Sequence, residues 1–154
     1  MLQLGVTGTS KGMTEAQKVS VTFMLTKMLE MRFYKGVMNN GDCVGADATF
    51  FLIWNDIVIN CKVNDIEYDM TTVGHIPLRS NARAYLPFTI LRKPKPYLER
   101  NQAIVDCSSV LIATPYEADE ILRSGTWSTI RRARKKGIKI AIVRPDGTVK
   151  YEVQ

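Results

Sequence analysis

Residues 124–143, SGTWSTIRRARKKGIKIAIV, contain a turn, a helix and a strand in succession, and they indicate the fold class of the whole chain. The polar turn Ser124-Gly125-Thr126 is followed by helical spacing of apolar and basic residues to position 136. Gly137 is typical of a helix C-cap, and KIAIV at 139–143 is typical of a buried strand. A helix that leads into a buried strand is the repeating unit of a parallel α/β sheet.

Strands and helices alternate in the same way through the rest of the chain. We expect strands at 2–8, 36–40, 71–77 and 109–115, and helices at 15–33, from about residue 46, and at 97–107. Thr14 and Gln17 have the spacing of a capping box before the 15–33 helix. That helix has apolar residues that we expect to face the core, namely Val19, Phe23, Leu25, Met28, Leu29 and Met31. The alternation predicts a Rossmann-like α/β fold with an open, mostly parallel sheet and flanking helices.

Three further segments complete the predicted architecture. IVINCKV at 57–63 either extends the second helix or forms a strand, because continuity favours the helix and β-branched residues favour the strand. Residues 79–95 are predicted to form a long irregular connection. Asp146-Gly147, between two apolar runs, predicts a C-terminal β-hairpin. Since no linker divides the sequence, we expect residues 1–154 to form one domain.

Composition narrows the classes of protein to consider. The 154 residues are 45% hydrophobic, but no apolar run approaches the roughly 20 residues of a membrane span. The N-terminal sequence lacks the order of a signal peptide, so we expect a cytoplasmic protein with no membrane partner. The three cysteines form no CxxC pair, which argues against a disulfide framework or a zinc site. We expect no metal and no cofactor.

The net charge of +6 favours an anionic partner, either a nucleotide or a nucleic acid. The basic residues concentrate in two runs, one at 92–95 and one at 131–136. Each run has the alternative interpretation of a solvated surface.

Three glycine-containing turns each follow a predicted strand and precede a predicted helix. In an open parallel sheet such loops lie at the carboxyl edge of the strands, where ligands bind. Glycine permits close backbone approach, and a helix N-terminus offers unpaired N–H groups to a phosphate. The candidate ligand-binding residues in these turns are Gly8, Thr9, Ser10, Gly41, Asp42, Gly45, Asp47, Gly125, Thr126 and Trp127.

Several of these side chains have alternative roles. Asp42 and Asp47 are candidates to cap a helix, to accept hydrogen bonds from ribose hydroxyls or to bind a cation, and Asp42 also to orient its loop. Trp127 either stacks on a base or fills the core. Cys43 lies in the candidate site, but the single histidine, His75, follows a distant strand, which is a poor arrangement for a catalytic dyad.

The order of these motifs resembles the SLOG superfamily of Rossmann-like nucleotide-binding domains, which includes the Smf/DprA proteins and the LOG phosphoribohydrolases. NNGDCVGADATF is similar to the SGxAxGIDxxAH stretch of the Smf/DprA proteins, and YLERNQAIVDCSSVLIATP to their RN or RK motif and central strand. SGTWSTIRRARKKGIKIAIVRP matches the final SGT-helix-Gly-strand-Pro segment. The resemblance covers most of the chain but not residues 56–95.

The resemblance implies a nucleotide or nucleotide-derived ligand and a homo-oligomer. It adds Arg100 and Asn101 to the candidate ligand-binding residues, with Arg100 either paired to phosphate or forming a salt bridge on a helix surface. It also exposes a departure, because the catalytic glutamate of the LOG motif PGGxGTxxE aligns with Thr129, which cannot act as a carboxylate. Glu117, Asp119 and Glu120 are candidate replacements, with a solvated acidic loop as the alternative.

We therefore favour a binding protein over an enzyme. SLOG domains sense nucleotide signals, including cyclic ADP-ribose-type signals in anti-phage defence, so the resemblance implies a domain that senses or sequesters such a signal, as a phage sponge would. One alternative is a LOG-like nucleoside-monophosphate phosphoribohydrolase. The other is a DprA-like binder of single-stranded nucleic acid that uses Tyr97, Trp127 and the basic run at 131–136.

Overall fold

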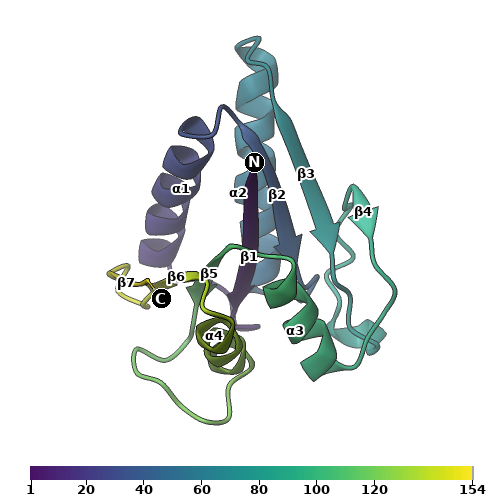
Figure 1. The fold of residues 1–154 in the computed structure, drawn as a ribbon, viewed down its shortest axis with the longest axis vertical. Coiled ribbons are helices and arrows are strands. Elements are labelled where there is room, and N and C mark those ends of the chain that lie inside the picture. Colours follow the sequence, from purple (N-terminus) through teal and green to yellow (C-terminus); the bar gives the residue numbers. More distant parts are fainter. Residues whose placement is uncertain (154) are drawn as a thin grey trace.

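The computed structural model describes residues 1–153, which form four α-helices around one seven-stranded sheet (Figure 1). The strands are β1 (Leu2–Gly8), β2 (Lys35–Asn40), β3 (Asp69–Gly74), β4 (Ile90–Leu91), β5 (Val110–Thr114), β6 (Lys139–Val143) and β7 (Val149–Glu152). The helices are α1 (Glu15–Glu30), α2 (Ala46–Val63), α3 (Tyr97–Asp106) and α4 (Gly125–Lys136), with a short 3-10 turn at Ser80–Ala82. The predicted α/β class is confirmed.

The order of the strands fixes where loops gather. The sheet runs β4-β3-β2-β1-β5-β6-β7, and only the last pair, β6 with β7, is antiparallel. From β1 the chain first builds the sheet in one direction, through β2 to β4, and then in the other, through β5 to β7. The loops after β1 and β5 therefore leave the sheet in opposite directions, which opens a crevice at their carboxyl ends.

Helices cover both faces of the sheet. α1 and α2 pack on one face, where Leu4, Val6 and Ile112 contribute to their core, and α3 and α4 pack on the other. Leu111 and Ala113 alternate with Ile112 and face the second core, which contains Trp127 and Ile130 of α4. This alternation explains the continuous apolar run of β5, because both of its faces are buried.

The structure resolves the segments that were ambiguous in the sequence. IVINCKV is helical and completes α2, and no separate strand interrupts it. The connection at 79–95 is largely irregular, as predicted, but it also contains the short strand β4. The hairpin is confirmed, with Gly147 at φ 85° in its turn, and Gly137 ends α4 in the left-handed conformation.

The expected core-facing side of α1 is partly wrong. Leu25 and Leu29 are buried, whereas Val19, Phe23 and Met31 are 70%, 65% and 76% exposed. The helix also ends three residues before the predicted position, because residues 31–34 turn into β2 with Phe33 and Tyr34 at positive φ. α1 therefore has apolar side chains on its outer surface as well as its inner one.

The basic run of α4 makes intramolecular contacts. Arg131 and Arg134 both pair with Glu120, and Arg134 also pairs with Glu152. The Lys136 ammonium donates to the carbonyls of residues 105, 106 and 108. Two of the five cations of this run thus pair with carboxylates, which weakens its interpretation as a cationic surface for nucleic acid. None of the helices described for residues 1–153 is long and apolar enough to cross a membrane.

Candidate functional site

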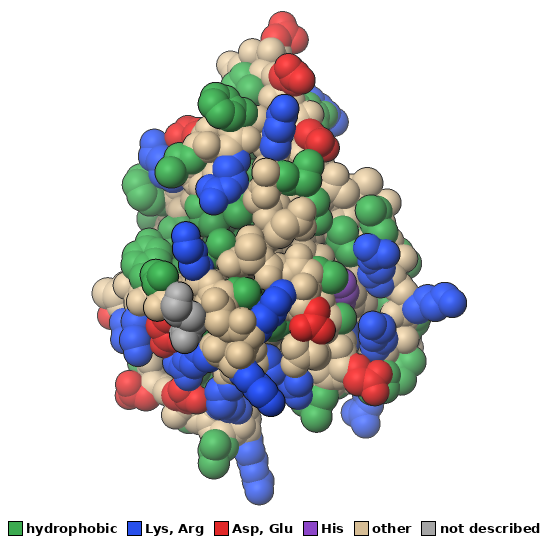
Figure 2. Space-filling model, viewed as in Figure 1, with side chains coloured by type: hydrophobic (Ala, Val, Ile, Leu, Met, Phe, Trp, Pro, Cys, Tyr) green, Lys and Arg blue, Asp and Glu red, His purple; other side chains and the backbone are tan. Residues whose placement is uncertain are grey.

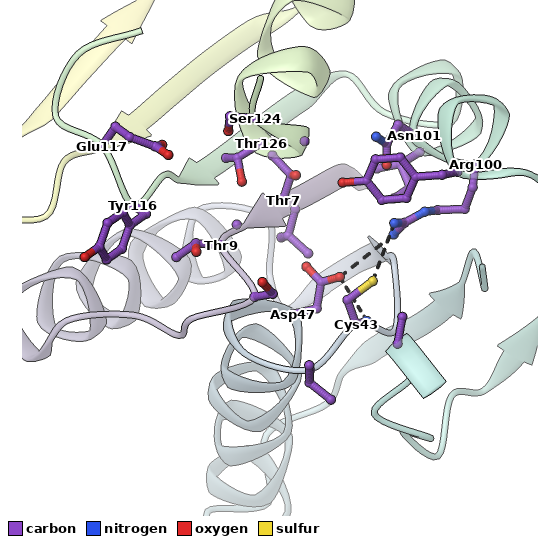
Figure 3. Close-up of a pocket in the computed structure, with 18 residues that line it drawn as sticks. Thr7, Thr9, Cys43, Asp47, Arg100, Asn101, Tyr116, Glu117, Ser124 and Thr126 are labelled. Carbon is purple, nitrogen blue, oxygen red and sulfur yellow. Dashed lines mark hydrogen bonds and ion pairs between the residues drawn. The ribbon is translucent and has the colours of Figure 1, made fainter. Parts of the chain in front are cut away.

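A cleft of about 350 Å³ lies at the carboxyl ends of β1 and β5 (Figure 3). Its walls come from four parts of the chain, at 6–10, 43–47, 97–104 and 116–126, together with Ala82. The sequence-predicted residues that line it are Gly8, Thr9, Ser10, Asp47, Arg100, Asn101, Gly125 and Thr126. The predicted residues outside the lining are Gly41, Asp42, Gly45 and Trp127. We refer to this site as the switch-point cleft, because the order in which strands are added to the sheet switches sides at β1.

The N-terminus of α4 forms one wall of the switch-point cleft. The Ser124 hydroxyl accepts a hydrogen bond from the Trp127 N–H at 3.2 Å and caps the helix. The N–H groups of Gly125 and Thr126 occupy the first two helical positions, which have no acceptor within a helix. With the positive end of the helix dipole behind them, these donors suit an anion in the cleft. Figure 3 shows Ser124 and Thr126 on the side of the cleft facing Thr7 and Thr9.

The loop after β1 contributes less than predicted. Thr9 donates its N–H to the Thr114 carbonyl at 3.2 Å, and its own carbonyl accepts from Gly12 and Ala46. The N-terminus of α1 does not line the cleft, because Thr14 and Gln17 form the predicted capping box and the Thr14 hydroxyl donates to the Pro145 carbonyl. The loop therefore supplies wall residues, but not a free helix N-terminus.

Gly41 and Gly45 make room for protein groups. A Cβ at Gly41 would collide with the Arg100 guanidinium, and one at Gly45 would collide with the Ser10 carbonyl. Gly45 also has φ 92°, which strains any residue with a side chain. Both glycines lie behind the wall and allow α2 and Arg100 to approach their neighbours closely.

The Asp42 side chain bonds to a distant loop, whereas the predicted role was to orient the turn that contains Asp42. Its side chain is fully buried, Oδ2 accepts from Arg83 Nε at 2.6 Å, and Oδ1 accepts from the Leu86 N–H at 2.9 Å. The predicted helix cap is wrong, because α2 has Gly45 at its N-cap position and no side-chain cap. Asp42 thus holds the 83–86 segment beside the cleft from outside the lining.

Asp47 is the aspartate that reaches the cleft. Its Oδ2 accepts from the Cys43 N–H at 3.1 Å and lies 4.0 Å from Arg100 Nη1. Burial raises its pKa to about 6, an effect that the Arg100 charge and the Cys43 N–H partly offset and the Asp42 charge reinforces. A buried carboxyl group in a cleft with a pKa near neutrality is typical of a functional site.

Arg100 is buried beside Asp47, so the predicted alternative of a surface salt bridge is wrong. Its Nη1 donates to the Gly41 carbonyl at 3.1 Å and its Nη2 lies 3.5 Å from Cys43 Sγ. The guanidinium also sits 5.1 Å from the centre of the Tyr97 ring. These contacts fix the guanidinium at the cleft wall, while Nε has no acceptor among the described residues.

Besides Arg100, two lining residues carry buried polar atoms without partners among residues 1–153. Asn101 is 3% exposed and its Nδ2 donates to no acceptor within residues 1–153. On the opposite side, Glu117 Oε2 is buried and accepts no hydrogen bond from the same part of the chain. Each unpaired group costs about 1–3 kcal/mol, which a ligand that completes its hydrogen bonds recovers.

Of the two aromatic residues that the sequence analysis named, Tyr97 lines the cleft and Trp127 does not. Trp127 is 4% exposed and fills the core between α4 and the sheet, which was its alternative role. Tyr97 and Tyr116 line the cleft instead, and Lys11 Nζ lies 3.9 Å from the centre of the Tyr116 ring. Tyr116 was missed because a single tyrosine after a strand carries no periodic signal.

The structure shows no arrangement for nucleophilic catalysis at Cys43. Burial and the Asp47 charge raise the pKa of the Cys43 thiol, which disfavours the thiolate. His75 Nε2 pairs with Asn39 Oδ1 at 2.9 Å, and His75 does not line the cleft. Residues 1–153 contain no group of three or more His, Cys, Asp or Glu side chains placed to hold a metal.

Thr129 has a structural role. Its hydroxyl donates to the Gly125 carbonyl at 3.0 Å, its side chain is 1% exposed, and it does not line the cleft. A glutamate at position 129, as in the LOG motif, would have to place its carboxylate in the buried space that the Thr129 side chain occupies. Of the three candidate replacements, only Glu117 lines the cleft, since Glu120 pairs with α4.

Comparisons with known proteins support the fold. No protein-family model matches the chain, and no curated protein matches it. Two solved chains match, one of which is the molybdenum cofactor binding protein from the phototrophic bacterium Rippkaea orientalis. The TM-score is 0.59 at 17% sequence identity, and the match covers 92% of this chain and 75% of the other. At this identity the likeness shows a shared Rossmann-like architecture.

Proposed function

We propose that the switch-point cleft binds a phosphorylated, nucleotide-derived ligand. The observation that carries the proposal is the N-terminus of α4 at the cleft wall, where the N–H groups of Gly125 and Thr126 donate no hydrogen bond within residues 1–153. A phosphate at this point accepts both hydrogen bonds. The volume of about 350 Å³ lies within the range of small-molecule sites.

The other lining groups suit the rest of a nucleotide. Asp47 and Glu117 are acceptors for ribose hydroxyls, and the unpaired Asn101 amide is a donor for a ligand oxygen or ring nitrogen. The Tyr116 ring offers a flat apolar surface against which a base stacks. The sequence had indicated both Asp42 and Asp47 for the ribose; Asp47 keeps this role in the proposal, and Glu117 takes the place of Asp42.

The SLOG resemblance refines this proposal to a nucleotide signal of the cyclic ADP-ribose type, which the chain senses or sequesters in a phage–bacteria conflict. The structural neighbour from Rippkaea orientalis is a molybdenum cofactor binding protein, so a small-molecule ligand on this architecture has a precedent. The cytoplasm, where such signals act, is the proposed location.

Native mass spectrometry with a panel of nucleotides and cyclic ADP-ribose isomers tests the proposal. We expect an intact ligand to remain bound, and Asn101→Asp, which replaces the unpaired donor by an acceptor, to weaken binding at least about tenfold. Thr26→Val removes a hydroxyl from α1, far from the cleft, and is the control that should bind normally. Equal binding by Asn101→Asp and the native protein would place the ligand elsewhere.

The position of Glu117 favours a second candidate, the LOG-like phosphoribohydrolase. Its buried, unpaired Oε2 at the cleft wall is the kind of group that exchanges a proton with a leaving base. The same spectra decide, because loss of a base with appearance of ribose 5-phosphate from a nucleoside monophosphate identifies cleavage. Glu117→Gln should then abolish cleavage and retain binding. An unchanged substrate mass retires this candidate.

A further inference from the structure

We propose that a second cleft, between α3 and the segment that follows β3, binds the phosphoryl group of an anionic ligand. This His75 cleft has a volume of about 530 Å³, and its charged lining consists of Arg92, Lys93, Lys95 and Arg100 against one carboxylate, Asp106. It includes the basic run at 92–95, which the switch-point cleft does not use. Arg100 lines both clefts, whereas Arg92 and Lys95 line only the His75 cleft, so variants of these two residues distinguish the two sites.

The charge of this basic run is uncompensated. Within residues 1–153, none of Arg92, Lys93 and Lys95 forms an ion pair, whereas Arg131 and Arg134 of α4 do. Figure 2 shows the single histidine beside Lys and Arg side chains on the same face of the molecule. Like charges held close together repel one another, and a bound anion removes that repulsion.

The backbone holds these cations in place. The Arg92 N–H donates to the Gly74 carbonyl at 2.9 Å, and the Lys95 N–H donates to the Ile76 carbonyl at 3.2 Å. The Lys95 carbonyl in turn accepts from Leu78, and Pro77 bridges to Lys95. The backbone of the basic run is therefore fixed as an extension of the sheet beyond β3 and β4, and its exposed side chains line the cleft from fixed backbone positions.

An unpaired buried donor lies in the same wall. The Arg100 side chain is 5% exposed, and its Nε has no acceptor among the described residues. Because Arg100 lines the His75 cleft, we expect an anion oxygen bound there to supply the missing acceptor. Guanidinium and ammonium groups around a shared anion are the usual donors to phosphoryl oxygens, which accept several charge-assisted hydrogen bonds at once.

His75 reports on the charge of this cleft. Burial, followed by the charges of Arg92, Lys95 and Arg100, lowers its pKa to about 4. An anion bound among those cations offsets their charge and raises the pKa of His75. Because the chain has a single histidine, one imidazole signal in an NMR spectrum follows this change.

The test titrates the full chain with inorganic pyrophosphate and follows the His75 signal. For the native protein we expect a saturable shift of the signal and an upward move of its titration midpoint. For Arg92→Gln/Lys95→Gln we expect a dissociation constant at least about tenfold higher. The matched control is Lys35→Gln/Lys139→Gln, which removes the same charge at the amino ends of β2 and β6. Lys93→Gln is a second variant with an exposed side chain and a smaller expected loss.

A parallel titration with a single-stranded oligonucleotide separates two sources of the phosphoryl group. Pyrophosphate binding alone identifies a small phosphate compound. Oligonucleotide binding that Arg92→Gln/Lys95→Gln loses identifies a nucleic acid backbone. No saturable shift of the His75 signal with either probe overturns the proposal, and so does an equal loss of binding in the Lys35→Gln/Lys139→Gln control.

Discussion

Asp47 shows how one buried group couples the candidate site to the stability of the fold. It is 5% exposed, and its ion pair with Arg100 spans 4.0 Å. The pKa of Asp47 is therefore about 6 in the folded state, compared with an ordinary value of 3.8, and the protonated form persists to a higher pH. A proton held more tightly by the folded than by the unfolded chain makes stability depend on pH.

The Asp47→Asn variant tests this coupling. The contribution of Asp47 to the free energy of unfolding is fully present below pH 3.8 and falls by at most about 3 kcal/mol as pH rises through 6. Asp47→Asn lacks this term, so its stability relative to the native protein should increase from about pH 4 to about pH 7. Urea denaturation of both proteins at each pH measures the difference between their free energies of unfolding. Folding lowers the pKa of His75, so its contribution changes with pH in the opposite sense, but it is the same in both proteins and cancels in the difference. A difference that is constant over this range contradicts the raised pKa.

Gly125 allows Tyr97 to approach the N-terminus of α4. A Cβ at position 125 would overlap the hydroxyl of Tyr97, whose half-exposed side chain can swing away, so Gly125→Ala should destabilise the fold by at most about 1 kcal/mol. Gly125→Ala/Tyr97→Phe, which lacks the hydroxyl, should recover part of the loss, because the end carbon of the ring would still lie 2.9 Å from the added Cβ. Thermal unfolding of the two variants and of Tyr97→Phe completes the double-mutant cycle. Additive effects would show that Tyr97 does not restrict this position.

The aspartates also show where residue-scale inference from sequence stops. Asp42 and Asp47 lie in the same turn, and nothing in the spacing separates them. The structure does so through the backbone, because Asp42 has φ 56° and points toward the 83–86 segment. That segment belongs to the middle of the chain, where the sequence has neither periodicity nor a motif.

At the scale of elements, Gln17 connects α1 to two strands. It is 1% exposed, and its Nε2 donates to the carbonyls of Pro115, after β5, and Val143, at the end of β6. Its Oε1 accepts from the Thr14 N–H in the capping box. One amide side chain thus fixes the start of a helix against the carboxyl edge of the sheet.

The Gln17→Leu variant should lose about 3 kcal/mol of unfolding free energy, because it leaves three buried or part-buried backbone groups without partners. Lys18→Ala changes an adjacent position whose ion pair with Glu15 is exposed, and it should cost less than about 1 kcal/mol. Chemical denaturation measures both. Equal losses for the two variants would contradict the connecting role of Gln17.

Elements with one dominant signal were predictable. The strand at 139–143 and the Gly137 cap follow from an unambiguous pattern, and the capping box located the start of α1 to the residue. The apolar side of α1 was predicted incorrectly because hydrophobic residues occur nearly all round it. Periodicity then cannot indicate that Val19 and Phe23 face outward.

At the scale of the whole molecule, alternation of strands and helices sufficed to predict the sheet and the edge at which loops gather. It did not predict that the order of strand addition reverses at β1, with β2 on one side of it and β5 on the other, which places the cleft. Residues 84–91 were not predictable either, because that connection is held by long-range contacts such as Arg83 with Asp42. The deciding contacts join positions about 40 residues apart, beyond any local pattern.

The exposed apolar side chains of α1 bear on the predicted homo-oligomer. Val19, Phe23 and Met31 present a surface that water solvates poorly, and burial against a second copy would stabilise a dimer. We expect size-exclusion chromatography with light scattering to show an oligomer, and Phe23→Glu to shift it to monomers. Glu15→Gln, at an exposed polar position of the same helix, should leave the mass unchanged. A native monomer would contradict the prediction.

The four-part wall of the switch-point cleft has a thermodynamic consequence. Residues 6–10 and 116–126 are brought together only when β1 and β5 have paired, so a half-folded chain has no cleft to offer. A ligand that binds there binds only the folded chain, and it raises the free energy of unfolding by about 2.7 kcal/mol when the free ligand concentration is a hundred times the dissociation constant. Melting temperature therefore serves as an assay for the unknown ligand, and a library of metabolites can be screened without any knowledge of the reaction.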